Sequence, residues 1–413
     1  MSEIVVKKSH ARLWFWICVS EFILLVILLM KYTDVSLVLN APDASAGPQP
    51  GERYYLGQPG PWGTPEYTRI NIEPPDDFIP PSDNVFPTTT WFFEGYDTRK
   101  LADFLGSCDL TPAQRTVVLN PANWLQDTNG LVVVPGVRTV LDLSPAARTK
   151  IYAVLAQNER NDFQCWPYTY RNGGFDDWFR NSGVSAPTTE LVHRLVYPRG
   201  NALCFSDLPE VFTVVTNLPE RHRLMKTLSR NASFLMKLQI STNTDVAKLV
   251  NYWAQDGRAK DIQPLLESLA EVPGGASLDI MHLLPPFARK RLNAYPVPPT
   301  DPNQPSPDCY WTALNFFNEP PDDRYYDDAI WRKELDTNYT IVDKPTYGDL
   351  VFLVHPDGVP VHCAVYLADN VVFTKNGYSF RQPWILMKLD DMLARYPATE
   401  PIKPVYFHAK ARQ

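Results

Sequence analysis

The sequence is poor in several features that would point directly to a functional class. Its 413 residues include only six cysteines, too few for a disulfide scaffold. We find no metal-ligand spacing, phosphate-binding glycine loop or serine-nucleophile elbow in the middle of the chain, and we predict neither a cofactor nor a metal. The net charge of −7 and the pI of about 5.6 exclude a strongly basic nucleic-acid binder.

Glycine is also scarce relative to proline, at 19 residues against 39. Since proline cannot lie inside helices or central strands, many of these prolines must fall in linkers and helix starts. The remaining composition is that of a folded protein, with 45% hydrophobic and 21% charged residues, which excludes wholesale disorder. At roughly 150 residues per domain, the length allows two to three domains.

One long apolar stretch is present, Leu13–Met30, and Glu21 is the single charged residue inside it. A bilayer core needs about 20 apolar residues, so the length is just sufficient for a membrane span. The basic residues before the stretch favour an N-terminus inside. We therefore predict an uncleaved single-pass anchor at 13–30, preceded by a cytoplasmic tail at 1–12. A cleavable signal peptide is the alternative interpretation.

The segments after this stretch differ in composition. Residues 31–95 are rich in proline, which is typical of a semi-rigid linker. Residues 96–296 have patterns of helix starts and helical spacing, which predict a mainly α-helical domain of unknown role. Its expected use is to position a substrate or a protein partner. A second proline-rich linker, 297–307, then marks a domain boundary before residues 308–413.

The most informative cysteine is Cys309. Asp308 is a plausible N-cap, and apolar residues then recur at the spacing of one helical face from Tyr310 to Phe317. Cys309 therefore lies in the first turn of a predicted helix. The N–H groups of a helix start stabilise a thiolate and can bind a developing oxyanion.

Two strands are predicted after this helix, over 347–354 and 361–367. Because side chains alternate along a strand, His362 and Cys363 point to opposite faces. We interpret Cys363 as a core residue. His362 is the candidate general base, and His355, which precedes a turn, is a weaker candidate.

A third strand follows a short turn and brings polar residues opposite His362. With a three-residue turn, Asn376 lies directly across from His362 and Thr374 lies nearby. A two-residue turn would place Lys375 there instead, and a charged lysine cannot accept the imidazole N–H. We favour Asn376 as the residue that orients the imidazole, with Thr374 as the alternative.

These elements together resemble the NlpC-type cell-wall peptidases, a bacterial papain-like family. The resemblance covers roughly residues 308–408 and rests on Asp308-Cys309, Gly348-Asp-Leu-Val-Phe352, His362 and Thr374. It implies a papain-like α+β domain with an antiparallel sheet. It also implies Cys–His nucleophilic catalysis on an amide of peptidoglycan stem peptides, with Thr374 at the family's third catalytic position.

The sequence departs from the family pattern at three positions. Tyr310 and Trp311 follow the cysteine where the family has Ser and Gly, and Ala364 replaces a glycine. Thr374 stands where the family prefers His, Asn or Gln, which leaves Asn376 as a substitute orienting residue.

The combined prediction is an α+β protein with one transmembrane helix, a helical middle domain and a C-terminal cysteine hydrolase. The resemblance places it in a bacterial inner membrane, with its N-terminus cytoplasmic and its bulk periplasmic. Its predicted partners are the membrane and peptidoglycan or another amide substrate, and no nucleic acid. One alternative is a non-catalytic, anchored binding module with an inactive papain-like domain. Another is a cysteine amidase or acyltransferase that acts on a lipid or other non-wall amide.

Overall fold

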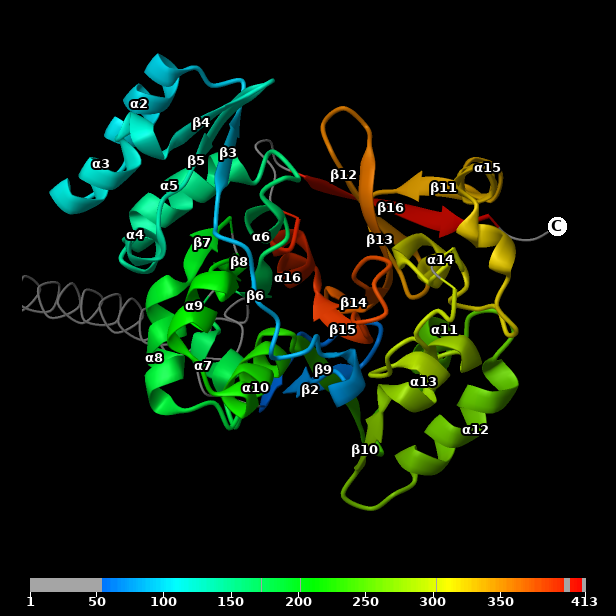
Figure 1. Ribbon diagram of the computed structural model, residues 1–413. Coiled ribbons are helices and arrows are strands. Elements are labelled where there is room, and N and C mark those ends of the chain that lie inside the picture. The colour runs from blue at the N-terminus through cyan, green and yellow to red at the C-terminus, as the bar shows by residue number, and fades with distance from the viewer. Residues whose placement is uncertain (1–53, 172, 201, 302, 397–401, 411–413) are drawn as a thin grey trace, which may run out of the picture. The chain divides into compact units, whose positions relative to one another are not determined.

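The computed structural model describes residues 54–171, 173–200, 202–301, 303–396 and 402–410 (Figure 1). Over these ranges the fold is α+β, and its strands form four antiparallel sheets joined by short helices. Two of the sheets are three-stranded, one is four-stranded and the C-terminal sheet is six-stranded.

The predicted membrane helix is not supported. In the described ranges no helix has both the length and the apolar character needed to cross a bilayer. The stretch that carries the prediction, 13–30, lies outside the described residues, as does the tail at 1–12. The fold class that included a transmembrane helix and the single-pass inner-membrane localisation that depended on it are therefore withdrawn.

The four-stranded sheet begins in the segment predicted to be a linker. Its order is β1 (Tyr54–Leu56), β2 (Thr64–Ile72), β9 (Asn231–Ile240), β10 (Ala276–Asp279). Strand β2 pairs with β9 along its whole length, from Thr64 opposite Gln239 to Ile72 opposite Asn231. The prolines of this segment flank a proline-free run at 66–72, so the backbone N–H groups needed for the ladder are present there.

The middle region contains the predicted helices but also two small sheets. The helices are α2 (Thr98–Gly106), α3 (Pro112–Val118), α4 (Val137–Leu141), α5 (Pro145–Leu155), α6 (Asp162–Cys165), α7 (Phe175–Phe179), α8 (Ala186–Leu195), α9 (Leu208–Val214), α10 (Leu218–Leu228), α11 (Val246–Trp253), α12 (Ala259–Ala270) and α13 (Pro286–Arg291). The sheets have the orders β3 (Trp91–Glu94), β5 (Gly130–Val133), β4 (Trp124–Asp127) and β6 (Tyr168–Arg171), β8 (Ala202–Phe205), β7 (Tyr197–Arg199). These strands are three or four residues long, too short to show a clear period-2 pattern.

The helix starts follow from local chemistry. Helices α3 and α5 each begin with a proline, and Thr111 and Ser144 cap their first turns as the sequence predicts. In α3 the cap is reciprocal, because Gln114 also bonds back to the backbone of Thr111.

The C-terminal region agrees closely with the predicted elements. Helix α14 (Cys309–Leu314) begins at the expected residue, and α15 (Asp328–Asn338) follows it. The six-stranded sheet has the order β11 (Tyr339–Val342), β16 (Lys403–Ala409), β12 (Leu350–Val354), β13 (Pro360–Ala368), β14 (Val371–Lys375), β15 (Trp384–Lys388), and α16 (Leu389–Ala394) follows β15. The strands predicted over 347–354 and 361–367 are β12 and β13.

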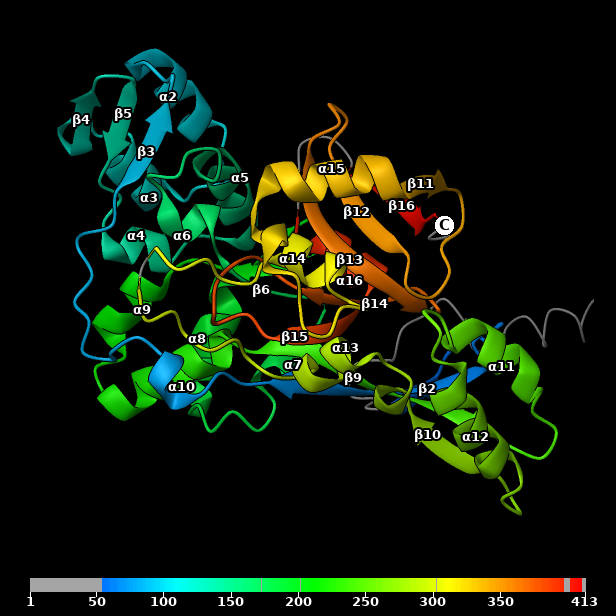
Figure 2. The same cartoon turned by 90° about the vertical axis from the view of Figure 1, so that its right-hand side faces the viewer.

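The described residues before and after the predicted linker at 297–307 belong to one compact unit. A single hydrophobic core joins the four-stranded sheet to one face of the six-stranded sheet. Hydrogen bonds across this junction include those from Tyr67 Oη to Asp369 Oδ2 at 2.8 Å and from the backbone N–H of Leu386 to Ser233 Oγ at 3.1 Å, and Tyr252 Oη of the adjacent α11 donates to the carbonyl of Leu367 at 2.7 Å. The views in Figures 1 and 2 show β15 beside β9, consistent with this packing.

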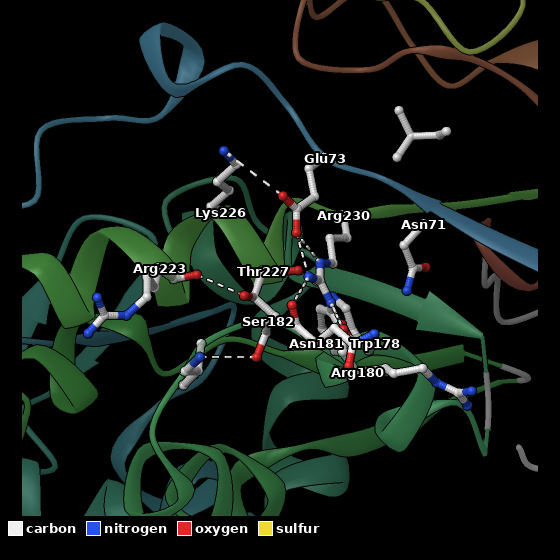
Figure 3. A network of polar contacts seen from close by, with 12 residues as sticks. Asn71, Glu73, Trp178, Arg180, Asn181, Ser182, Arg223, Lys226, Thr227 and Arg230 are labelled. Carbon is white, nitrogen blue, oxygen red and sulfur yellow. Dashed lines mark hydrogen bonds and ion pairs between the residues drawn. The ribbon is translucent and has the colours of Figure 1, made fainter.

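A buried arginine anchors the end of β2 to the middle region (Figure 3). Arg230 forms an ion pair with Glu73 and donates to the carbonyls of Trp178 and Arg180 at 2.8 and 2.7 Å. Because the Arg230 side chain is 5% exposed, these partners satisfy most of a buried guanidinium. This network is structural, since each of its bonds closes a contact between neighbouring segments.

Candidate active site

Cys309 is the first residue of α14. Asp308 caps the helix, with its Oδ1 accepting from the backbone N–H of Trp311 at 2.7 Å. Helix α14 packs against β13 and β14, so its first turn lies over the sheet. The cysteine is only 5% exposed.

Opposing effects act on the Cys309 thiol. Burial is the largest and raises its pKa, and the neighbouring Asp308 carboxylate raises it further, to about 12. The backbone N–H groups of Cys363, Cys309 and Tyr310 act in the opposite direction and favour the thiolate. Since burial dominates, the resting thiol is protonated at neutral pH.

His362 is fully buried on β13, and hydroxyl groups contact both of its ring nitrogens. Its Nε2 lies 2.8 Å from Thr374 Oγ1, and its Nδ1 lies 2.9 Å from the hydroxyl of Tyr396. The rings of His362 and Tyr396 also stack, with centroids 4.7 Å apart. Thr374 can in turn donate to the carbonyl of Cys363 at 3.5 Å, which fits an imidazole protonated at Nε2.

Burial also controls the charge of this imidazole. It lowers the pKa of His362, the nearby Arg395 lowers it further, and the result is about 3. The imidazole is therefore neutral at physiological pH. With the thiol also neutral, the resting site holds no thiolate–imidazolium ion pair.

The thiol and the imidazole approach β13 from opposite faces. Cys363 packs in the same core as Trp311 and Leu314 of α14, so α14 covers the Cys363 face. The other face packs with α16, and His362 lies there with Tyr396. Figures 1 and 2 show the sheet between α14 and α16. Alternation along β13 predicts the two faces correctly, but it does not indicate which one the cysteine helix covers.

Away from the turn, the pairing of β13 with β14 agrees with the register predicted for a three-residue turn. Val365 lies opposite Phe373 and Tyr366 opposite Val372, and the ladder is irregular next to the turn, where Ala368 pairs with Val371. Continuing the regular register places Asn376 across from His362.

The contact to the imidazole nevertheless comes from Thr374. Asn376 turns its Nδ2 toward Met387 Sδ at 3.5 Å. Its Oδ1 is buried without a hydrogen-bond partner among the described residues. The geometry therefore favours Thr374 over Asn376 as the orienting residue.

Two residues beside the site are missed by the sequence prediction. Lys375 is fully buried on the face that α14 covers, and its Nζ donates to the carbonyls of Gly377 and Ser379 at 2.7 and 2.9 Å. Burial lowers its pKa to about 8, although the charges of Asp308 and Cys309 oppose this. The alternation that puts Thr374 beside His362 could have placed Lys375 on the opposite face.

Tyr396 is the second missed residue. It lies two residues after the end of α16 and 34 positions from His362. Only tertiary packing brings these two side chains together, so no local motif indicates the contact.

The remaining candidates have structural roles. Cys363 is fully buried, and burial raises its thiol pKa well above the ordinary value, as expected for a core cysteine. His355 lies in the β12–β13 loop, where its backbone N–H bonds to the carbonyl of Val359. The described ranges contain no group of three or more His, Cys, Asp or Glu side chains placed to hold a metal ion.

Comparisons with known proteins add no relative: the chain matches no protein-family model, no curated protein and no solved structure. The resemblance to the NlpC-type peptidases over 308–408 therefore remains a prediction based on the residues themselves.

Proposed function

We propose that the C-terminal region is a thiol-dependent amide hydrolase in a closed resting state, with Cys309 as the nucleophile. The observation that carries the proposal is the position of Cys309 as the first residue of α14, directly after the Asp308 N-cap, where the helix itself does not use the backbone N–H groups of its first turn. Such groups stabilise a thiolate and also the oxyanion that forms when it attacks a carbonyl.

His362 is the proposed base, oriented by Thr374. The hydrogen bond from His362 Nε2–H to Thr374 Oγ1 leaves Nδ1 as the nitrogen that receives a proton. In the resting state Nδ1 faces the Tyr396 hydroxyl, so Tyr396 must move before the base can act. Because His362 lies on the face of β13 opposite the one that α14 covers, this part of the strand must also rearrange before the imidazole can reach the Cys309 thiol.

The reaction then follows ordinary acyl transfer. The Cys309 thiol gives its proton to His362, and the thiolate forms a C–S bond to the amide carbonyl. The tetrahedral intermediate expels the amine, which takes the proton from the imidazole. Water then hydrolyses the thioester and restores the thiol. The resemblance supports a peptidoglycan stem-peptide amide as the substrate, with a lipid amide as the alternative.

A second candidate is a non-catalytic binding module. The observation that favours it is the electrostatic state of the site, because burial keeps both Cys309 and His362 neutral and both imidazole nitrogens are occupied. A domain that has lost activity would keep these groups as packing.

One experiment separates the two candidates. The full chain is incubated with purified muropeptides and, separately, with fatty-acyl amides, and the products are identified by mass spectrometry. Cleavage by the wild type but not by Cys309→Ala supports the hydrolase and identifies the substrate class. Equal product from both proteins, or none from either under conditions where a muropeptide binds, contradicts the hydrolase and favours the binding module.

A further inference from the structure

A small cavity lies where β2, β6 and β9 meet α16. Its volume is about 20 Å³, and three arginines on different elements line it: Arg69 of β2, Arg171 of β6 and Arg395, which follows α16. The rest of its wall includes Asp391 and Tyr170 and is otherwise apolar, with Phe234 and Met387 among its residues. Apolar walls exclude bulk water and strengthen electrostatic interactions inside.

Two guanidinium groups reach this cavity with an unused donor. The Arg69 side chain is 7% exposed, and its Nε has no hydrogen-bond partner among the described residues. Asp177 Oδ2 lies 3.9 Å from the Nε of Arg69, and Asp391 Oδ2 lies 3.7 Å from its Nη1, both too far for good hydrogen bonds. The Nε of Arg171 is likewise buried without a partner in the described ranges. A buried, unpaired donor of this kind is costly.

The carboxylates nearby do not balance the positive charge. Asp177 is shared, since Arg171 donates to it at 3.0 Å and Arg180 lies 3.3 Å from its other oxygen. Burial raises the pKa of Asp391, although Arg69 and Arg171 oppose this. Among the residues that line the cavity, three guanidinium groups, from Arg69, Arg171 and Arg395, face one carboxylate, that of Asp391.

We propose that this cavity binds one small monovalent anion of the size of chloride, held by the Nε–H groups of Arg69 and Arg171. The volume is close to that of a single water molecule, which excludes phosphate, sulfate and organic carboxylates. The surplus of guanidinium charge favours an anion over water. Arg395 adds charge from the C-terminal side, so the ion joins β2 and β6 to the segment that carries Tyr396.

The test compares anions of different size at equal ionic strength. Thermal unfolding of the full chain is followed while sodium chloride replaces sodium gluconate, so that general screening stays constant. Chloride is expected to raise Tm along a saturable curve, because it binds only the folded state. Arg69→Met is expected to abolish the saturable rise. Arg138→Met is the matched control, since Arg138 is 91% exposed on α4, and it should respond as the wild type does.

A direct measurement keeps the proposal falsifiable if Arg69→Met does not fold. Crystals of the wild type are grown or soaked in sodium bromide, and anomalous diffraction locates the bromide ions. The expected result is a strong peak between Arg69 and Arg171. Density for water alone at that position, or an identical chloride response in the wild type and a folded Arg69→Met, would overturn the anion site.

Discussion

The two faces of β13 differ in whether the polar side chains beside them are charged or neutral. The face under α14 combines a thiol with a half-buried carboxylate and a buried ammonium, those of Asp308 and Lys375. The face under α16 has a chain of neutral hydrogen bonds, from Tyr396 through His362 to Thr374. One strand thus separates the proposed nucleophile from the proposed base. The proposed activity requires β13 to rearrange so that the His362 imidazole can reach the Cys309 thiol. We expect this rearrangement near His362.

The largest expected effect is on the α14 face, at the thiol itself. Cys309→Ala should lower turnover by roughly 10³-fold or more, because no other group replaces the nucleophile. Cys363→Ala should cost ~1 kcal/mol of stability and leave kcat nearly unchanged, since Cys363 is a packing residue. Activity assays and urea unfolding of both variants check this. Activity retained in Cys309→Ala would exclude it as the nucleophile.

His362, on the α16 face, should cause most of the decrease in the free energy of unfolding at acidic pH. Burial lowers the pKa of His362 from its ordinary 6.5 to about 3, so between these values the unfolded state binds the extra proton. Stability contributed by the neutral imidazole is therefore lost as pH falls from 6.5 toward 3, by up to about 5 kcal/mol. His362→Gln should reduce this loss.

Urea unfolding at several pH values measures the slope directly. His282→Gln removes an exposed histidine and is the matched control. If the two variants lose the same stability at acidic pH, the His362 imidazole is not held neutral as the structure indicates.

Lys375, on the α14 face, should instead change the free energy of unfolding at alkaline pH. Burial lowers the pKa of Lys375 from 10.5 to about 8, so the unfolded state binds more protons between these values and stability rises with pH there. Below pH 8 the charged lysine costs up to about 3 kcal/mol. Lys375→Met should therefore be more stable than the wild type at pH 7. Part of this gain is offset because the carbonyls of Gly377 and Ser379 lose their hydrogen-bond donor.

Titration of the Cys309 thiol should change stability in the opposite direction. Its raised pKa means that the folded state binds more protons between pH 9 and about 12, so stability falls over that window. The rise due to Lys375 should be clearest between pH 8 and 9. Unfolding curves of Lys375→Met and of the exposed Lys344→Met across this range provide the measurement, and a gain shared by both variants would contradict the assignment.

Local sequence patterns predicted much of the C-terminal region. The N-cap at Asp308, the start of α14 and the strands β12 and β13 follow from helix signals and apolar runs. Strand β2 was hidden among prolines, because the proline-free run inside the segment is short. The face that α14 covers and the contact from Tyr396 depend on tertiary packing, which periodicity cannot indicate.

The hairpin illustrates the limit of register arguments. Continuing the pairing places Asn376 opposite His362, yet Thr374, the diagonal neighbour, makes the hydrogen bond. A strand register determines which backbones face each other. Side-chain reach and rotamer then decide which neighbour contacts the ring.

The smallest expected effect compares these two residues. Thr374→Val removes the hydroxyl while keeping the shape of the side chain. The base would lose its orientation but not its presence, so kcat should fall about 10- to 100-fold with KM nearly unchanged. Asn376→Ala should stay close to the wild type, because Asn376 makes no contact with His362 that depends on its amide.

Thr374→Ser retains the hydroxyl and should restore most of kcat, which separates hydrogen bonding from packing. Steady-state kinetics on the amide that the wild type cleaves, with urea unfolding in parallel, measures both effects. The unpaired Nε2–H in Thr374→Val should also cost about 1–3 kcal/mol of stability. If Asn376→Ala is the impaired variant and Thr374→Val is not, His362 changes its partner when substrate binds. The Thr374 bond would then belong only to the closed state, and the two faces of β13 would be coupled through Asn376.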